Sequence, residues 1–424
     1  MIAKFLHKLR LALGDVALRN RVLFLFGALV VFRGLAAIPI SGIDRVRLEQ
    51  FFQNNQFFGL LNVFSGGGFS HLSLVMLGVG PYITASIIMQ LATVIFPQVK
   101  AMYQDEGEVG RTQFITWSRL LTIPLAALQG VAFLSLLQNQ GILPTLTPFL
   151  TIVDVLLVAS GSLLLMWIGE LITEFGIGNG VSIIIFAGII ARVPSGISQA
   201  LFSASAANIP AYIGFVAIAL IAIYLVVMVS EAERSIPIAY ARQVRGAANA
   251  SGAATYLPIR LLQAGVVPII FALSLLLLPQ MVINGLAAIG VKGLATASSW
   301  YSAFANNPWE YGAVYFVLVV MFTYLYTSIT FEPHRVAENL QKSGAFVPGV
   351  RPGAETEKYI GAVVNRVTLP GALFLGFIAV VPFVVQGVTG ISAVLVGGTA
   401  LLIAVTVLLD LIRKVDAQIS LREY

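Results

Sequence analysis

The side chains most able to do chemistry in this chain are ionisable residues that interrupt long apolar segments. They are Arg33, Asp154, Glu170, Glu174 and Asp410. A charge inside a bilayer costs at least about 2.5–3.5 kcal/mol, so such a residue usually couples transport to ions or anchors a helix. All five lie toward the ends of their segments, and Glu170 and Glu174 suit capping or anchoring. The sequence therefore indicates no charged site at mid-membrane.

Enzymatic chemistry has little support in the sequence. The chain contains no cysteine, which excludes thiolate nucleophiles and disulfides. Neither a phosphate-binding G-x-x-x-x-G-K-[ST] loop nor a zinc-binding H-E-x-x-H motif occurs, and of three histidines only His71 could approach the membrane interior. We therefore expect no enzyme, no catalytic, cofactor-binding or metal site and no cofactor. Any energy for transport must then come from another protein.

The composition indicates a polytopic membrane protein. Of 424 residues, 58% are hydrophobic and only 10% are charged, and the mean hydropathy is +0.91. Soluble domains carry roughly 25% charged residues, and a membrane-spanning helix needs ~20 apolar residues. The apolar runs predict ten transmembrane helices, at about 22–40, 75–96, 114–137, 151–172, 180–200, 211–230, 257–283, 310–330, 362–386 and 391–412.

The distribution of lysine and arginine predicts the orientation. Basic residues concentrate in the segments on the side of the N-terminus, so both termini are expected to be cytoplasmic. Basic and apolar residues alternate in segment 1–21, which suits an amphipathic helix on the cytoplasmic membrane face, and segment 413–424 would be a cytoplasmic tail. A cleaved signal peptide over 1–37 is the alternative, less favoured because the apolar run continues to Ile40 and further spans follow.

Ten spans divide into two halves of five, 22–200 and 201–412. An odd number of spans per half gives the halves opposite topology, and inverted repeats of this kind leave weak internal similarity. Here "GVGPYITAS" (Gly78–Ser86) aligns with "GVVPIIFAL" (Gly265–Leu273), with a proline superposed on a proline. The halves are therefore expected to be related by a pseudo-two-fold axis in the membrane plane.

A second, fainter alignment pairs "GVSIII", which ends at Ile185, with "GTALLI", which ends at Ile403. Together the two alignments superpose four isoleucines, which would meet near mid-membrane at the seam between the halves: Ile83, Ile185, Ile270 and Ile403. The alternative is that each is an ordinary lipid-facing or packing residue. An apolar constriction excludes ions by dewetting and makes no specific contacts with its guest. The pattern thus favours a pore for chemically varied cargo.

The stretch "NVFSGGGFSHLSL" (Asn62–Leu74) is poor material for a membrane-spanning helix. A helix of about 12 residues over Phe57–Phe69 is too short to cross ~30 Å, and three consecutive glycines would hinge it. Non-helical backbone at membrane depth persists only inside protein or beside a water-filled cavity. We expect a movable half-helix that obstructs the pore. An external loop with a surface helix over 45–74 is the alternative.

Two cytoplasmic loops, at about 231–256 and 331–361, are long enough to be functional. Their basic residues could attract an anionic partner such as ribosomal RNA. Topology alone also places positive charge on this side, so the charge does not by itself establish docking.

Four stretches together resemble the SecY family, the channel-forming subunit of the Sec protein translocase. They are "FSGGGFSHLSLVMLGVGPYITASIIMQL" (64–91), "MWIGELITEFGIGNGVSIIIFAGI" (166–189), "YARQVRGAANASGAATYLPIRLLQAGVVPIIFA" (240–272) and "ENLQKSGAFVPGVRPG" (338–353). The resemblance implies an all-α polytopic fold of ten transmembrane helices, in two inverted five-helix halves around an hourglass pore, with a plug half-helix before span two. It implies a protein-conducting channel that translocates unfolded secretory polypeptides across the bacterial cytoplasmic membrane and releases transmembrane segments laterally into lipid.

The resemblance also implies roles for particular residues. The pore ring would comprise Ile83, Ile87, Val181, Ile185, Ile270 and Ile403. The plug, about 57–70, would include Phe57, Leu60, Leu61, Val63, Phe64, Ser65, Gly66, Gly67, Gly68 and Phe69. A lateral gate between spans two and seven would carry Gln90, Gln129 and Ser274. Ribosome and motor docking would use Arg242, Arg245, Lys342, Arg351 and Lys358.

The partners that the resemblance implies are SecE and SecG homologues, the SecA motor ATPase, the ribosome with its rRNA, signal sequences, nascent or unfolded polypeptides, and membrane lipids. The chain departs from the family pattern in places. Gln243 follows Arg242 where two basic residues are frequent, Tyr256 replaces a common histidine, and Phe175 replaces a common arginine. These departures put docking through loop 231–256 in doubt and leave the channel function untouched.

A secondary transporter with ten spans is the main alternative function. It requires an essential ionisable residue at mid-membrane, for which Arg33, Glu170 and Asp410 are the candidates. An intramembrane hydrolase lacks a recognisable motif, and a lipid-anchored scaffold would leave the symmetry of the seam unexplained.

Overall fold

The computed structural model describes residues 15–40, 72–139, 141–144, 147–191, 209–240, 255–263, 267–288, 295–389 and 393–420, with the single residues 194, 265 and 293. Four expected features lie outside these residues, wholly or in large part. They are most of the amphipathic segment 1–21, the plug at 57–70, and the docking residues Arg242 and Arg245.

Within the described residues, each of the ten expected spans overlaps a helix. These are α2 (Val16–Ala36), α5 (Gly80–Ile95), α7 (Gly107–Asn139), α8 (Pro148–Phe175), α9 (Gly180–Ile190), α11 (Ile209–Glu231), α12 (Val267–Ala288), α14 (Pro308–Thr330), α16 (Ala354–Thr389) and α17 (Ala393–Ser420). By length and composition, four of the described helices suffice alone to cross a bilayer: α7, α8, α14 and α16. Helices α9, α11 and α12 contribute shorter apolar stretches.

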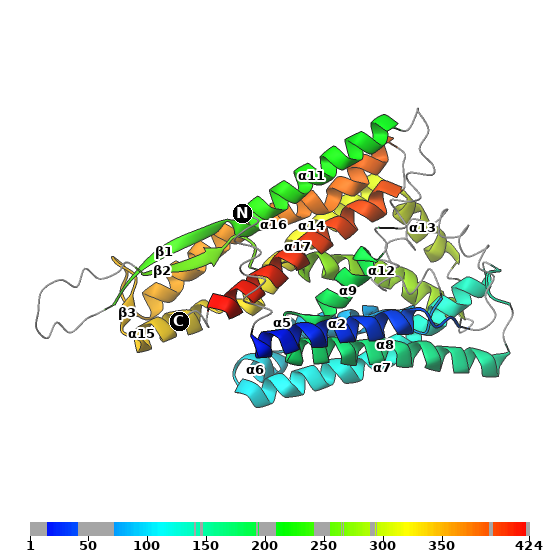
Figure 1. Ribbon diagram of the computed structural model, residues 1–424, viewed down its shortest axis with the longest axis horizontal. Coiled ribbons are helices and arrows are strands. Elements are labelled where there is room, and N and C mark those ends of the chain that lie inside the picture. Colours follow the sequence, from blue (N-terminus) through cyan, green and yellow to red (C-terminus); the bar gives the residue numbers. More distant parts are fainter. Residues whose placement is uncertain are drawn as a thin grey trace, which may run out of the picture.

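The helices form two groups on either side of a central seam (Figure 1). Helices α2, α5, α7 and α8 lie along one side, and α11, α14, α16 and α17 lie along the other. Helices α9 and α12 lie between the groups, where α9 contacts α17 and α12 packs against both α5 and α7. The chain order thus places the first half on one side of the seam and most of the second half on the other.

The outer faces of the helices carry large apolar side chains in the open. Val30 of α2, Val317 of α14 and Phe377 of α16 are 71%, 61% and 67% exposed. Soluble monomers rarely expose apolar patches that extend over several elements. The two groups of helices therefore present a surface suited to lipid around a buried seam.

Span two starts later than its apolar run predicts. Residues 72–79 form turns, and α5 begins at Gly80 with Pro81 in its first turn. Proline favours this position because it has no N–H group to leave unpaired there. At the other end Pro97 starts α6 (Pro97–Gln104), whose axis is bent by 109° from that of α5.

Span seven was expected to begin at residue 257, and that boundary is wrong. Residues Thr255–Arg260 form strand β2, which pairs antiparallel with β1 (Glu233–Tyr240) and places Ile236 opposite Leu257. Helix α12 starts only at Val267, next to Pro268. Pro258 disfavours a helix at this point, and the strand is held instead by residues far away in the chain.

The described parts of the two long loops fold together as one unit at the end of the molecule where α16 begins. Strand β3 (Ala345–Phe346) joins β1 on its free edge, giving the order β2-β1-β3. Helix α15 (Pro333–Lys342) precedes it, and α16 starts eight residues before the expected span. A small core joins the hairpin to this helix: Ile236, Ile259, Val347, Ile360 and Val364. At the opposite end, α13 (Ala295–Asn306) is a short helix that we did not predict (Figure 1).

Candidate functional site

The isoleucines predicted from symmetry are all buried in the same hydrophobic core. Ile83, Ile185, Ile270 and Ile403 are between 0 and 5% exposed and come from four helices, α5, α9, α12 and α17. Ile87 is also buried, and Val181 is partly buried against the same hydrophobic cluster. None of them faces outward as a lipid-exposed residue would. The structure therefore brings all six expected pore residues to the central core.

The residues just before α5 and α12 repeat one another in conformation. Gly78 and Gly265 have φ angles of 58° and 59°, a region in which glycine is favoured. Each helix then begins one residue before its aligned proline. The aligned pairs Ile83 and Ile270 are both buried. The geometry thus agrees with the internal repeat read from sequence.

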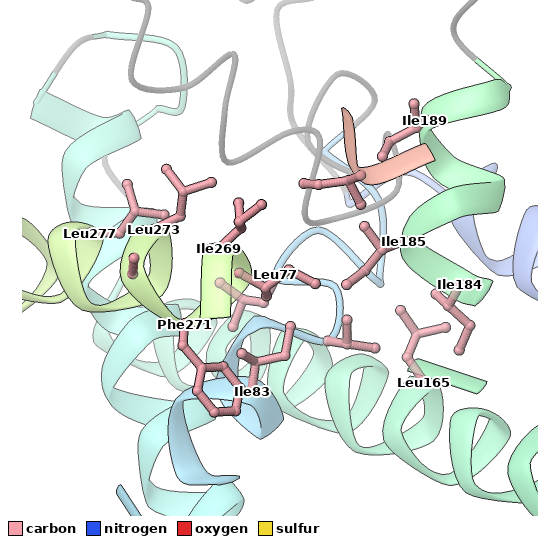
Figure 2. Close-up of a cluster of buried hydrophobic side chains, with 14 of the residues drawn as sticks. Leu77, Ile83, Leu165, Ile184, Ile185, Ile189, Ile269, Phe271, Leu273 and Leu277 are labelled. Atoms are coloured by element: carbon pink, nitrogen blue, oxygen red, sulfur yellow. The ribbon is translucent and has the colours of Figure 1, made fainter. Parts of the chain in front are cut away.

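Several residues that the sequence did not single out complete the centre of this core. Figure 2 shows Leu77, in the turn before α5, among the side chains of Ile83, Ile185 and Ile269. Leu77 and Ile269 are 4% and 1% exposed. Leu77 lies one residue before the repeated glycine, which was the available signal for its position. The centre is apolar on the α5, α9 and α12 sides.

Close packing between α8 and α9 holds the α9 wall in place. A Cβ atom on Gly180 would lie 1.9 Å from the carbonyl oxygen of Gly169, so no larger residue fits at the start of α9. The Asn179 side chain accepts a hydrogen bond from the Ser182 N–H at 3.1 Å and caps the helix. These contacts fix the direction in which Ile185 projects.

The expected gate residues lie along the packed helices α5, α7 and α12, but they do not form one network. Gln129 Nε2 on α7 donates to Thr84 Oγ1 on α5 at 3.5 Å, and Gln90 Nε2 donates to Ser86 Oγ at 3.3 Å within α5. Gln90 Oε1 is buried without a partner, and Ser274 is half-buried on α12. Within the described residues, no hydrogen bond joins Gln90, Gln129 and Ser274 to one another.

One contact across the seam was not predicted. Arg335 of α15 forms an ion pair with Glu332 at 2.6 Å, and its Nη2 donates to the carbonyl oxygen of Gln104 at the end of α6. This joins the loop of the second half to the bent helix of the first half. The sequence shows only that the loop is basic. It could not indicate the partner of Arg335, because the acceptor is a main-chain atom.

Two of the ionisable residues considered first are paired with basic neighbours. Glu170 Oε1 lies 2.7 Å from Arg119 Nε on α7, and Asp410 lies 2.9 Å from Lys414 one turn along α17. These pairs suit the anchoring role expected of Glu170. Arg33 is exposed in the last turn of α2, and Asp154 is buried in α8. Within the described residues no group of three metal-binding side chains occurs.

Arg351 lies on a rigid turn at the end of the loop unit. Its carbonyl oxygen accepts a hydrogen bond from Thr356 Oγ1 at 2.8 Å, and Gly349 and Gly353 flank it with positive φ angles of 84° and 97°. The side chain is exposed, and its guanidinium group has no partner among the described residues. The backbone of Arg351 is therefore fixed, whereas its guanidinium group is available to a partner.

The other docking residues are less constrained. Lys342 pairs with Glu338 at 2.7 Å within α15, and Lys358 is exposed on α16. On the same two helices, His334 Nδ1 lies 2.9 Å from Glu357 Oε2. The hydrogen bond to the Glu357 carboxylate raises the pKa of His334 above its usual value. The unit thus presents both free and paired charges on one surface.

Comparison with known proteins gives concordant results. The family model described as SecY matches residues 73–412. The protein translocase subunit SecY of Mycobacterium bovis is 38% identical over 444 residues, covering 100% of this chain and 99% of that protein. Its counterpart in Thermotoga maritima is 40% identical over 418 residues, covering 96% and 94%.

Solved structures agree in fold. A structure of a protein-conducting channel superposes with a TM-score of 0.67 at 18% identity, covering 96% of this chain and 93% of that one. Sec61 from a canine ribosome–channel complex superposes with a TM-score of 0.64 at 19% identity, with the same coverage. At these identities the likeness shows the fold alone, and it confirms the predicted helical fold class.

Proposed function

This chain belongs to the SecY family, and we propose that its central isoleucines form the closed constriction of a channel for unfolded polypeptides. The protein is a subunit of the protein translocase. The observation that carries the proposal is the burial of Ile83, Ile185, Ile270 and Ile403 on four helices from both halves. A ring drawn from both halves widens when the halves separate, which a ring within one half would not do.

The constriction seals by being apolar. Ile87 and Val181 extend the four isoleucines along α5 and α9, so that water finds no polar partner at the waist. Narrow apolar passages exclude ions by dewetting. A polypeptide of any sequence can replace the aliphatic contacts, because they are non-directional. The segment 57–70 would add a movable obstruction above this waist.

The gate is the contact of α5 and α7 with α12. The hydrogen bond from Gln129 to Thr84 joins α7 to α5 on one side of this contact, and the buried Gln90 Oε1 has no partner to lose when α5 and α12 part. A signal sequence gains about 0.3–0.6 kcal/mol for each large apolar residue that moves into lipid. A segment of about ten such residues therefore contributes about 3–6 kcal/mol toward holding the helices apart.

The loop unit is the docking surface for the cytoplasmic partners, namely the SecA motor ATPase and the ribosome. The free guanidinium of Arg351 and its fixed backbone support this assignment, since a pre-positioned arginine binds carboxylate or phosphate with little entropic loss. Helix α6, the hairpin β1–β2, α15 and the C-terminal end of α17 all lie at one end of the molecule (Figure 1). This common end is the cytoplasmic face of the bacterial inner membrane, with both termini on it.

The chain supplies the conduit and no catalytic step, so energy for translocation comes from the motor or the ribosome. SecE and SecG homologues complete the membrane complex. A mechanical role of this kind requires only that the halves separate and close again.

The proposal is tested by the resting ion conductance of the complex in planar bilayers. Replacing Ile83, Ile185, Ile270 and Ile403 together by glycine removes the aliphatic waist and should raise the baseline conductance severalfold. Replacing the same four residues by leucine conserves volume and should leave the baseline low. An unchanged baseline in the glycine variant would show that these residues are not the seal.

A further inference from the structure

An open groove of about 430 Å³ lies where the hairpin leaves the bundle. Its walls are the residues that follow α11, the residue after β2, and one face of α16. Leu261, Val363 and Val367 give it an apolar floor, and Arg234 and Arg366 give it two guanidinium groups. The volume is in the range of ordinary small-ligand sites.

The two guanidinium groups are available to a ligand. Arg234 and Arg366 are exposed, and neither has a hydrogen bond or ion pair within the described residues. By contrast, the nearby Arg413 is already used, with Nη2 2.7 Å from Glu231 Oε1. Glu233 also borders the groove and opposes the binding of an anion. The groove nevertheless keeps an excess of positive charge.

An exposed apolar stripe on α16 runs from the groove toward the part of the helix expected to lie in the membrane. Arg366, Leu369, Leu373 and Phe377 follow one another at the spacing of a single helix face. The three apolar residues are 48%, 45% and 67% exposed. From Arg366 to Phe377 the helix rises roughly 16 Å, at ~1.5 Å per residue, which is about half of the ~30 Å hydrocarbon thickness. The stripe is thus as long as one leaflet, with the arginine at its polar end.

We propose that this groove binds an anionic glycerophospholipid, whose phosphate is held by Arg234 and Arg366 and whose acyl chains lie along Leu369, Leu373 and Phe377. Guanidinium groups match phosphate oxygens in geometry and charge. The apolar stripe selects a lipid over a free phosphate ion, which has no chains to cover it. The length of the stripe selects a lipid over a soluble acidic peptide.

Such a lipid would join elements that belong to different parts of the chain. Arg234 begins the hairpin of the loop unit, and Arg366 lies on the helix that continues into the membrane. The bound phosphate would therefore fix the loop unit relative to α16 at the membrane surface. This inference concerns the outer surface of the protein and does not depend on the channel proposal.

Native mass spectrometry of the full chain with its partner subunits, delipidated in detergent and titrated with dioleoyl phosphatidylglycerol, tests the proposal. The variant R234Q/R366Q should bind the lipid roughly 25-fold more weakly, because each basic residue near an anionic surface contributes about a fivefold factor. The matched control R21Q/K100Q removes two exposed charges on α2 and α6, outside the groove, and should bind as the unaltered protein does. An equal loss in both variants would show diffuse attraction only and overturn the site.

Two further measurements complete the test. One uses a variant that should bind the lipid more tightly, and the other compares the lipid with a soluble phosphate compound. E233Q removes the opposing carboxylate and should tighten phosphatidylglycerol binding severalfold. Glycerol 1-phosphate, which has the phosphate without the chains, should bind far more weakly than the lipid. Unchanged or weaker lipid binding in E233Q, or glycerol 1-phosphate binding as tight as that of the lipid, would contradict the proposal.

Discussion

Gly78 and Gly265 adopt the same left-handed backbone conformation, with φ of 58° and 59°, although they lie in opposite halves of the chain. Each precedes a helix that starts one residue before a proline and buries an isoleucine at the seam. A turn of this kind is used twice because it sets the direction of the helix that follows. The repeated turn is the structural trace of the internal symmetry.

Replacing Gly265 by alanine should destabilise the protein by about 1–2 kcal/mol, the cost of a left-handed conformation for an L-residue. A Cβ atom at this position meets nothing within 4 Å, so the conformational cost acts alone. The measurement is the midpoint of unfolding in an SDS titration. Gly214 of α11 also has open space around it but an ordinary helical backbone, and G214A should shift the midpoint in the opposite direction. Equal shifts in both variants would show that the turn is not the cause.

The contact between His334 and Glu357 should weaken as the pH rises. The hydrogen bond and the charge of Glu357 raise the pKa of His334, so the pair stabilises the α15–α16 contact fully below the ordinary histidine pKa of about 6.5. That stabilisation is lost as the pH rises through the raised pKa of His334. His7 and His71 are the other two histidines, and replacing both by glutamine leaves one imidazole to follow by NMR.

In that background the titration midpoint of His334 should fall when Glu357 is changed to glutamine. The variant keeps a hydrogen-bonding side chain of similar size but removes the charge. The same midpoint with and without the carboxylate would rule out the ion pair in solution.

Reversing Arg351 to glutamate should reduce protein export at least roughly tenfold, because the loss of a charged partner at an interface typically costs 2–5 kcal/mol. Lys358→Glu changes charge by the same amount on the same unit but on a flexible side chain, so its effect should be smaller. Export of a reporter protein is compared at matched membrane levels of each variant. Normal export in R351E would remove the docking role from this residue.

Much of the architecture could be predicted from the sequence because it rests on local signals. Each apolar run of the sequence overlaps a described helix, and the shared glycine and proline located the repeat, whereas α6, α13 and α15 were not predicted. The central position of Ile83 and Ile270 followed from that repeat. Signals of this kind depend on residues close together in the chain, which is where sequence patterns are most informative.

The remaining features depend on contacts between distant residues. The apolar residues of strand β2 suit either a strand or the start of span seven. Only the pairing with β1 decides for the strand, and that pairing is not visible in the local sequence. The hydrogen bond from Arg335 to the carbonyl oxygen of Gln104 could not be predicted, because any residue offers the same main-chain acceptor. The pairing of Glu170 with Arg119 likewise required the crossing of α7 and α8.

Disulfide crosslinking from Ile83 tests the central claim most directly, because the native chain contains no cysteine to give background. A cysteine at Ile83 should form a disulfide with a single cysteine in a secretory polypeptide that is stalled during translocation. It should form none with the same polypeptide before translocation has started. A cysteine at Val317, which is 61% exposed on the outer face of α14, should form none. No crosslink at Ile83, or an equal yield at Val317, would contradict a path through the isoleucine ring.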